Sequence, residues 1–246
     1  MKYLSGIISS ILLACSASAG AAKATVPASC MARSLGFGQA GVGWVHQPLS
    51  KMKRDTVYSL VQEDGRTVLR GVADRAASLY VAVLKPPTDL PASMAWRWKT
   101  DALVPDADNR DKNREDAPLR VLVAFDGDKS TLPKEEQKRF QRAKTLTGRN
   151  VPYATLMYIW SNHVPVNTVI SSAHTAQLKM LVAASGSKGL GRWQSVHRNL
   201  AADYKRAFGA APGRVLGVAV MTDTDNTGTK AVGEYADIRL DCGGAE

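Results

Sequence analysis

Short runs of β-forming residues recur along most of this chain, and turn residues separate them. About ten such runs, rich in Val, Ile, Thr, Tyr, Phe and Trp, are recognisable. They lie at residues 56–61, 67–72, 78–84, 94–100, 120–125, 154–160, 177–184, 192–197, 215–222 and 232–240. Because no helical segments alternate with them, a parallel βαβ sheet is not expected. The pattern predicts an all-β fold, an antiparallel β-sandwich or jelly roll.

Turn residues set two of the strand ends. Asp64 and Gly65 lie between the first two runs, where an Asp-Gly pair is typical of a two-residue hairpin turn. Pro86 and Pro87 follow the third run and are expected to end that strand, because proline lacks the N–H that a sheet needs.

Tryptophans stand inside several of the predicted strands. Trp96 and Trp98 should share one face of their strand, with Arg97 on the other, because strand side chains alternate. Trp160 and Trp193 lie in two further runs. Aromatic faces stack on sugar rings, but a tryptophan in a sandwich also serves as core. Both interpretations stay open for these residues.

Two segments are predicted to be helical. Residues 133–146 are dense in Lys, Glu, Gln and Arg and predict a solvated surface helix. Residues 200–208 carry apolar side chains at every fourth position, with Asn199 as N-cap and Gly209 as C-cap. Residues 101–118 predict a polar loop.

The N-terminal segment predicts export. Residues 1–24 combine Lys2, an apolar stretch and two small-x-small cleavage sites, as a secretory signal peptide does. Residues 12–15, Leu-Leu-Ala-Cys, resemble a lipobox, so Cys15 is either a lipid anchor or is discarded with the peptide. No later run is apolar over the length that a transmembrane helix needs. Residues 25–246 are then expected to form a single β-sandwich domain in the periplasm or at the outer membrane.

Cys30 and Cys242 remain after such cleavage, one near each end of the mature chain. An even number of cysteines in an exported protein indicates a disulfide, and the first and last strands of a sandwich are often neighbours. We therefore predict a Cys30–Cys242 bond.

The charge balance narrows the class of partner. The formal charge is +10, and removing residues 1–24 with Lys2 and Lys23 leaves +8. Export argues against nucleic acid as a partner, so anionic glycans, lipopolysaccharide or anionic lipid head groups are the better candidates. The alternative is a generally basic, soluble surface.

No strong catalytic motif is present. The chain lacks Gly-x-Ser-x-Gly, His-Glu-x-x-His, a phosphate-binding glycine loop and Cys-x-x-Cys, and its four histidines have no metal-ligand spacing. Whether the protein is an enzyme is left open, and no cofactor is expected.

The densest polar motif is residues 222–228, Thr-Asp-Thr-Asp-Asn-Thr-Gly. Asp223, Asp225 and Asn226 are candidates to bind a ligand or Ca²⁺ through oxygen, although the motif lacks the spacing of an EF-hand. Asx side chains also close tight turns without any ligand. Both alternatives remain.

Three arginines alternate with apolar residues in the predicted strands: Arg97, Arg120 and Arg198. A row of arginines on one sheet face would clamp a carboxylate or sulfate. The same arginines could instead form structural ion pairs. The acids available for such pairs are Asp116, Asp203 and Asp223.

A series of motifs then makes a family resemblance visible. In order they are Met94-Ala-Trp-Arg-Trp-Lys, Leu119-Arg-Val-Leu-Val-Ala-Phe-Asp, Met157-Tyr-Ile-Trp-Ser, Arg198-Asn-Leu, Asp203-Tyr-Lys-Arg-Ala-Phe-Gly, Val218-Ala-Val-Met-Thr-Asp-Thr-Asp-Asn-Thr-Gly and Glu234-Tyr-Ala-Asp-Ile-Arg-Leu. Over residues 35–241 the chain resembles the bacterial family catalogued as domain of unknown function 3047. That family has a denser Asp-Asp-x-Ala-Ala-Arg stretch where this chain has Glu115-Asp116-Ala-Pro-Leu-Arg120. The resemblance implies export and a concanavalin-like, glycan-facing jelly roll, but no activity.

Three functions follow as hypotheses. The first is a carbohydrate- or envelope-binding protein, the second a polysaccharide lyase or glycoside hydrolase, and the third a structural envelope lipoprotein. The second requires Asp116, Asp223 or Asp225 to meet Arg120 in one cleft. The candidate ligand-binding residues are Trp98, Asp116, Arg120, Trp160, Arg198, Asn199, Asp223, Asp225 and Asn226.

Overall fold

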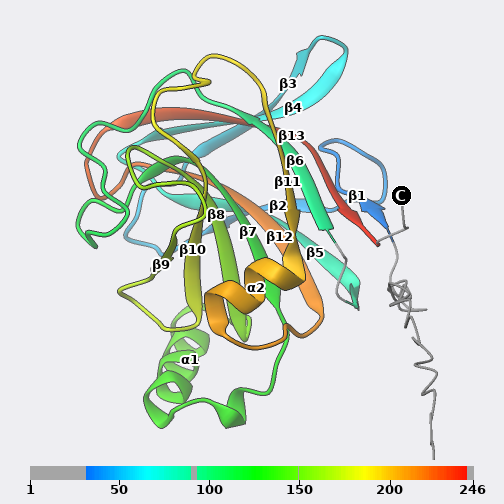
Figure 1. Ribbon diagram of the computed structural model, residues 1–246, viewed down its shortest axis with the longest axis vertical. Coiled ribbons are helices and arrows are strands. Elements are labelled where there is room, and N and C mark those ends of the chain that lie inside the picture. The colour runs from blue at the N-terminus through cyan, green and yellow to red at the C-terminus, as the bar shows by residue number, and fades with distance from the viewer. Residues whose placement is uncertain (1–31, 90–92, 149, 243–246) are drawn as a thin grey trace, which may run out of the picture.

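Two stacked β-sheets make up most of the protein, as the sequence predicted. The computed structural model describes residues 32–89, 93–148 and 150–242. Figure 1 shows the sheets face to face, with a helix below them at one end. Sheet A consists of β1 (Arg33–Ser34), β3 (Val57–Glu63), β4 (Arg66–Asp74), β6 (Ser93–Lys99), β11 (Gln194–Asn199) and β13 (Lys230–Asp241). Its strands run in the order β11-β6-β13-β4-β3, with β1 also paired to β13.

Sheet B runs in the order β2-β5-β12-β7-β8-β10-β9. Its strands are β2 (Trp44–Pro48), β5 (Ser78–Thr88), β7 (Ala117–Phe125), β8 (Ala154–Ser161), β9 (Val169–Ser171), β10 (Leu178–Ser185) and β12 (Val215–Asp223). One pair departs from the predicted antiparallel arrangement, because β8 and β10 are parallel. The chain between them returns along the sheet and forms β9, so β10 starts again in the direction of β8.

The main core lies between the two sheets, and a second apolar cluster, which includes Leu122, Met157 and Met221, lies on the other face of sheet B. Trp96 and Trp98 point inward and are at most 1% exposed, while Arg97 between them faces outward. They pack against Tyr158 and Trp160 from β8, with ring centroids 5.0 and 6.1 Å apart. The predicted alternation in β6 is therefore confirmed, and it fixes which residues sheet A presents to solvent.

Of the two strand ends predicted from turn residues, the structure confirms the first and contradicts the second. Asp64 and Gly65 both have positive φ, 49° and 73°, and join β3 to β4 as predicted. The expectation that Pro86 and Pro87 end a strand was wrong, because β5 continues to Thr88. Its register against β12 shifts here, so the prolines occupy a bulge where no ladder N–H is needed.

The two helices lie outside the sheets. α1 (Lys134–Thr147) and a preceding 3₁₀ turn, η1 (Lys129–Thr131), project at the lower end in Figure 1. α2 (Leu200–Phe208) has the predicted bounds, and the side chain of Asn199 caps its N-terminus by accepting from Ala202 N at 2.9 Å. Within the described residues, neither helix is long and apolar enough to cross a membrane.

The N- and C-terminal ends of the described chain are neighbours. β1 pairs with the end of β13, with Arg33 opposite Leu240 and Ser34 opposite Arg239. Cys242 follows β13, whereas Cys30, Cys15 and the predicted signal peptide lie outside the described residues. The disulfide therefore stays a prediction, and the β1–β13 pairing supports it.

Candidate functional site

The acidic residues that the sequence singled out meet at one end of sheet B. Asp116 precedes β7, Arg120 lies within it, and Asp223 ends β12. Because β7 and β12 pair, with Asp223 opposite Ala117 and Met221 opposite Arg120, segments far apart in sequence come together here. One carboxylate oxygen each of Asp116, Asp223 and Asp225 lies within 4.8 Å of the others. We call Asp116, Arg120, Asp223 and Asp225 the buried carboxylate cluster.

Each carboxylate of this cluster is already held by donors. Arg120 Nη2 lies 2.9 Å from Asp223 Oδ2, and Lys53 Nζ lies 2.5 Å from Asp225 Oδ2. Asp116 Oδ2 accepts from the backbone N and the hydroxyl of Thr227, both at 2.7 Å. The cluster therefore closes the loop after β12 against the start of β7.

Arg120 is almost wholly buried, with an exposed fraction of 3%. Nη2 also donates to the carbonyl of Glu115, and Nη1 lies 3.1 Å from Met157 Sδ. Its Nε has no hydrogen-bond partner within the described residues. The sequence left open whether Arg120 clamps a ligand or forms a structural ion pair. Its contacts correspond to the second alternative, an ion pair with Asp223.

The two neighbouring aspartates have opposite electrostatic environments. Burial raises the pKa of the Asp223 carboxyl well above its usual range, although Arg120 acts against this. Burial also acts to raise the pKa of Asp225, but hydrogen bonds from Asp223 and Lys53 favour its charged form and lower the pKa overall. The pKa of Asp223 is therefore shifted upward and that of Asp225 downward within the same cluster.

This arrangement limits what the cluster does chemically. Asp116 and Asp223 are 1% and 4% exposed, so a glycosidic bond cannot reach them without movement of the covering loop. A cation placed among the carboxylates would meet the guanidinium of Arg120 and the ammonium of Lys53. Asn226, a further candidate, donates its backbone N–H to Asp116 and its amide to the carbonyl of Lys112. The described contacts make the cluster an anchor for the 223–229 loop.

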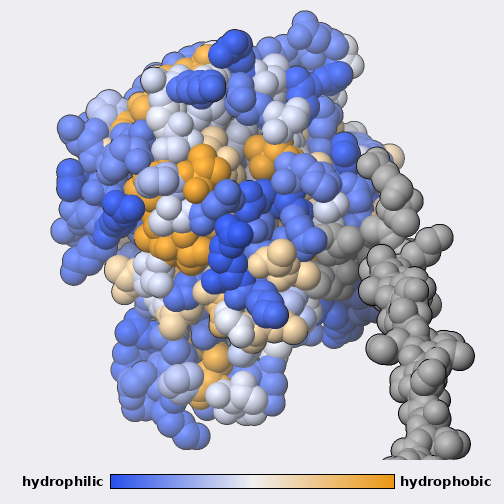
Figure 2. Space-filling model, viewed as in Figure 1, coloured by the Kyte–Doolittle hydropathy of each residue, from blue (hydrophilic) through white to orange (hydrophobic). Residues whose placement is uncertain are grey.

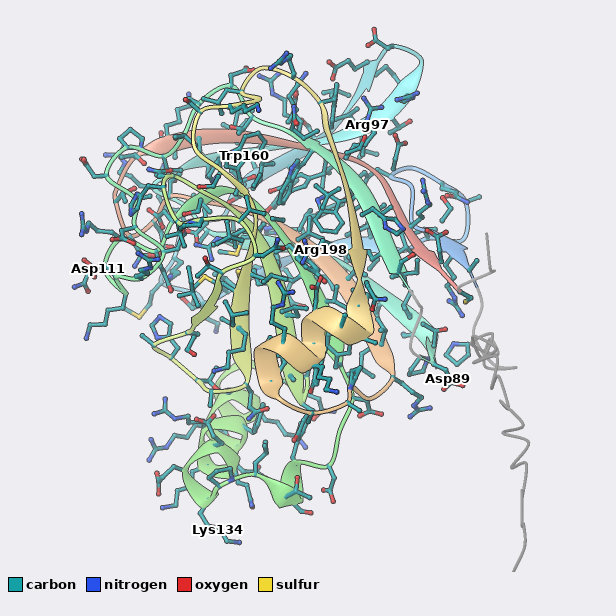
Figure 3. All side chains as sticks on the ribbon, viewed as in Figure 1. Asp89, Arg97, Asp111, Lys134, Trp160 and Arg198 are labelled. Atoms are coloured by element: carbon teal, nitrogen blue, oxygen red, sulfur yellow. The ribbon has the colours of Figure 1, made fainter. Side chains whose placement is uncertain are left out.

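The other arginine candidates do not form one row. Arg198 lies on the inner side of β11 and makes a bidentate pair with Asp203, with both N···O distances at 2.7 Å. Tyr158 donates to the same carboxylate at 3.0 Å, and Asn199 caps α2. Arg97 faces outward from sheet A, while Arg120 belongs to sheet B. Figure 3 shows Arg97 and Arg198 well apart.

The tryptophan candidates are core residues in this structure. Trp98 and Trp160 are 0% and 1% exposed, so neither ring offers a face to a ligand. Trp160 Nε1 donates to the carbonyl of Gly186. Trp193, just before β11, is only partly buried. Arg97 and Lys99 each lie 5.1 Å from its ring centroid.

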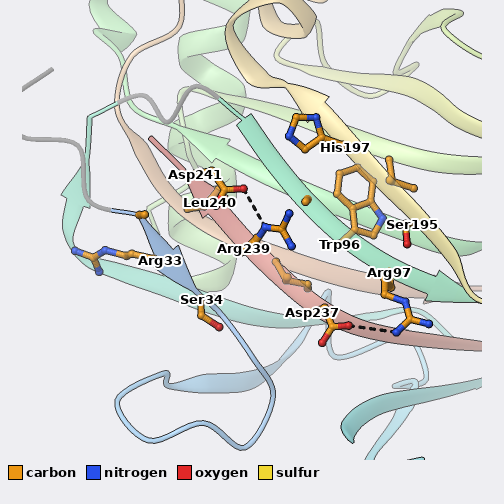
Figure 4. Close-up of a pocket in the computed structure, with 14 residues that line it drawn as sticks. Arg33, Ser34, Trp96, Arg97, Ser195, His197, Asp237, Arg239, Leu240 and Asp241 are labelled. Carbon is orange, nitrogen blue, oxygen red and sulfur yellow. Dashed lines mark hydrogen bonds and ion pairs between the residues drawn. The ribbon is translucent and has the colours of Figure 1, made fainter. Parts of the chain in front are cut away.

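A groove that the sequence did not reveal runs over the outer face of sheet A. It has a volume of about 640 Å³ and lies along β6 between β11 and β13, with β1 at its end (Figure 4). We call it the β6 groove. The side chains that matter for its chemistry are Arg33, Ala95, Arg97, Ser195, His197, Asp237, Arg239 and Asp241.

Ala95 forms part of the floor of the β6 groove and is 6% exposed. Ala95 stands opposite His197 on β11 and opposite Arg239 on β13, so a methyl group lies between two longer side chains. Two residues further along β6 the sizes are reversed. The long side chain of Arg97 stands between two short ones, those of Ser195 on β11 and Ala236 on β13. The position of Arg97 on the face opposite the tryptophans was predicted from the sequence, but the residues that stand beside it on β11 and β13 were not.

The face of the molecule seen in Figure 2 carries many hydrophilic side chains with hydrophobic patches among them. Two ion pairs line the groove, Arg97 Nη1 to Asp237 Oδ2 at 3.4 Å and Arg239 Nε to Asp241 Oδ2 at 3.1 Å. The side chains in these pairs are 26–55% exposed, so solvent screens each pair and it adds little to stability.

Comparison with known proteins gives a family and two distant folds. A family model described as "Protein of unknown function (DUF3047)" matches residues 42–239. The family 11 carbohydrate-binding module of the cellulosomal cellulase Lic26A-Cel5E of Clostridium thermocellum is similar over 88% of this chain and 98% of that one, at 8% identity and a TM-score of 0.43. The glycoside hydrolase domain of Endo-D from Streptococcus pneumoniae R6 is similar over 82% of this chain and 22% of that one, at 7% identity and a TM-score of 0.38. No curated protein matches the sequence. At these scores the two structural likenesses carry no argument about function.

Proposed function

The chain belongs to the family described as "Protein of unknown function (DUF3047)", as its motifs predicted, and we propose that it is an exported protein that binds carbohydrate of the cell envelope in the β6 groove. The observation that carries this proposal is the groove itself, an open channel on the face of sheet A whose lining combines charged and apolar residues. A volume of about 640 Å³ falls in the range of ordinary ligand sites.

The chemistry of the groove suits sugar hydroxyls. A hydroxyl both donates and accepts, and the walls offer both kinds of partner. Arg97 and Arg239 supply donors, Asp237 and Asp241 supply acceptors, and Ser195 supplies either. Because these groups project from paired strands, a bound chain would meet them in fixed positions.

Export rests on separate features. The signal-like segment at residues 1–24 and the cysteine pair favour an oxidising compartment. The β1–β13 pairing brings Arg33 opposite Leu240, so Cys30 and Cys242 are each only a few residues from paired positions. Lipidation at Cys15 is the corresponding alternative for a structural envelope protein.

A second candidate function is hydrolysis or lyase chemistry at the buried carboxylate cluster. The convergence of Asp116, Asp223 and Asp225, and the opposite pKa shifts of the last two, favour it. Against it stands burial, because Lys53 and the 223–229 loop cover the acids. Carbohydrate binding in the β6 groove requires no such opening and is therefore preferred.

The test fills the groove without changing its charge. Ala95→Phe places a ring on the floor, where the side chain faces outward, and Ala95→Ser is the matched control. The mature protein is screened against a panel of neutral and acidic polysaccharides by affinity electrophoresis. We expect at least one polysaccharide to bind the wild type and Ala95→Ser, and to lose binding to Ala95→Phe. Absence of binding to every polysaccharide, or equal binding by both variants, would refute the proposal.

A further inference from the structure

Cations outnumber acids around the β6 groove. Arg33, Arg97 and Arg239 line it together with two carboxylates, those of Asp237 and Asp241. Asp237 is also approached by Arg66, outside the groove, with an N···O distance of 3.7 Å. Arg33 makes no ion pair within the described part of the chain. The groove therefore has uncompensated positive charge before any ligand enters.

The strand register concentrates this charge around a notch. The row across sheet A reads His197, Ala95, Arg239 and Ser34 on β11, β6, β13 and β1. Neighbouring strands lie about 4.8 Å apart, so His197 and Arg239 flank a gap of roughly 10 Å above Ala95. Arg97 lies two positions along β6 from Ala95, on the same face. The register therefore groups the outward side chains of His197, Arg239 and Arg97 around Ala95, which is itself 6% exposed.

We propose that the β6 groove is specific for acidic carbohydrate, with a carboxylate or sulfate of the sugar chain held above Ala95 by His197, Arg239 and Arg97. The proposal rests on the carbohydrate-binding function proposed above and names its ligand class. The guanidinium groups bind the anion by charge-assisted hydrogen bonds. Arg239 exchanges its exposed pair with Asp241 for the ligand.

The surroundings favour a sugar chain over a lipid surface. Large exposed hydrophobic side chains within the described residues are Val45, Met52, Val57, Leu60, Val83 and Val166. These residues do not line the β6 groove. A membrane-binding face would need apolar side chains beside the cations, so anionic lipid is the alternative that the test must exclude.

The experiment is isothermal titration calorimetry of the mature protein at about 0.15 M salt, where long-range charge effects are largely screened. The probes are polygalacturonate for carboxylate, dextran sulfate for sulfate, and neutral xylan and dextran. Arg239→Gln is compared with Arg142→Gln, which removes the same charge from the exposed surface of α1. Liposomes containing anionic phospholipid are tested by co-sedimentation.

We expect an acidic polymer to bind, and Arg239→Gln to weaken that binding about tenfold while Arg142→Gln leaves it unchanged. Equal binding of the neutral polymers would overturn the anionic specificity and leave the proposed carbohydrate binding standing. An equal loss of affinity in Arg239→Gln and Arg142→Gln would also overturn the anionic specificity of the groove. The polymer would then be attracted by the overall positive charge of the protein. If no polymer binds, or only the liposomes do, the proposed function fails with it.

Discussion

Asp116→Ala is expected to be one of the most destabilising substitutions outside the core, because this carboxylate anchors the 223–229 loop. It is 1% exposed and accepts from the backbone N of Asn226 at 3.2 Å and of Thr227 at 2.7 Å. The Thr227 hydroxyl also donates to Asp116, but it can bond the Thr229 hydroxyl instead when the carboxylate is removed. The substitution therefore leaves two backbone N–H groups without an acceptor.

The magnitude follows from these two groups. An unsatisfied buried donor costs about 1–3 kcal/mol, and the exposed position of Asn226 lets water compensate part of its share. We expect a loss of about 2–3 kcal/mol in the free energy of unfolding. For a chain of this size that lowers the melting temperature by roughly 5–10 °C.

Asp225→Ala is the matched control from the same cluster. Asp225 makes an ion pair with Lys53, whose side chain is 41% exposed, and its Oδ1 has no partner within the described residues. Its side chain is 17% exposed and bonds the side chains of Asp223 and Lys53, but no described backbone N–H group donates to it, so its removal should cost about 1 kcal/mol, less than that of Asp116. Urea unfolding followed by circular dichroism measures both variants. If Asp225→Ala costs as much as Asp116→Ala, the loop is not anchored through Asp116 and the reasoning is wrong.

Three further predictions concern the cluster and the cysteines. Because burial raises the pKa of Asp223, the folded state binds more protons than the unfolded state above about pH 4, so stability should fall as pH rises from there. Urea titrations at several pH values should show a flatter dependence for Asp223→Asn, and an unchanged slope would reject the assignment. Excess Ca²⁺ should not raise the melting temperature, since Arg120 lies among the carboxylates; a rise that Asp225→Ala abolishes would indicate a cation site. Thiol titration of the unfolded, unreduced mature protein should find no free thiol from Cys30 or Cys242, whereas two would exclude their bond.

Local signals explain the successful sequence predictions. The bounds of α2 follow from Asn199 and Gly209, which act on their immediate neighbours, and the hairpin turn follows from Asp64 and Gly65. The inward position of Trp96 follows from strand alternation alone. Each of these features depends on residues within one turn or one strand, so a single sequence suffices.

Long-range pairing explains the predictions that failed or stayed open. Arg97 and Arg120 alternate in the same way within their strands, yet β6 and β7 belong to different sheets. The convergence of Asp116 with Asp223 depends on the pairing of β7 with β12, which local pattern does not specify. The β6 groove depends on the same kind of information, because Ala95 matters only once His197 and Arg239 are known to flank it.

The central claim is that the β6 groove is the carbohydrate-binding surface, and backbone NMR tests it most directly. Amide resonances of the isotope-labelled mature protein are followed while a galacturonate hexasaccharide is added. The largest shifts should map to β6, β11 and the end of β13, around Ala95, His197 and Arg239. Shifts confined to the 223–229 loop and the start of β7 would instead place the ligand at the buried carboxylate cluster, and would contradict the account.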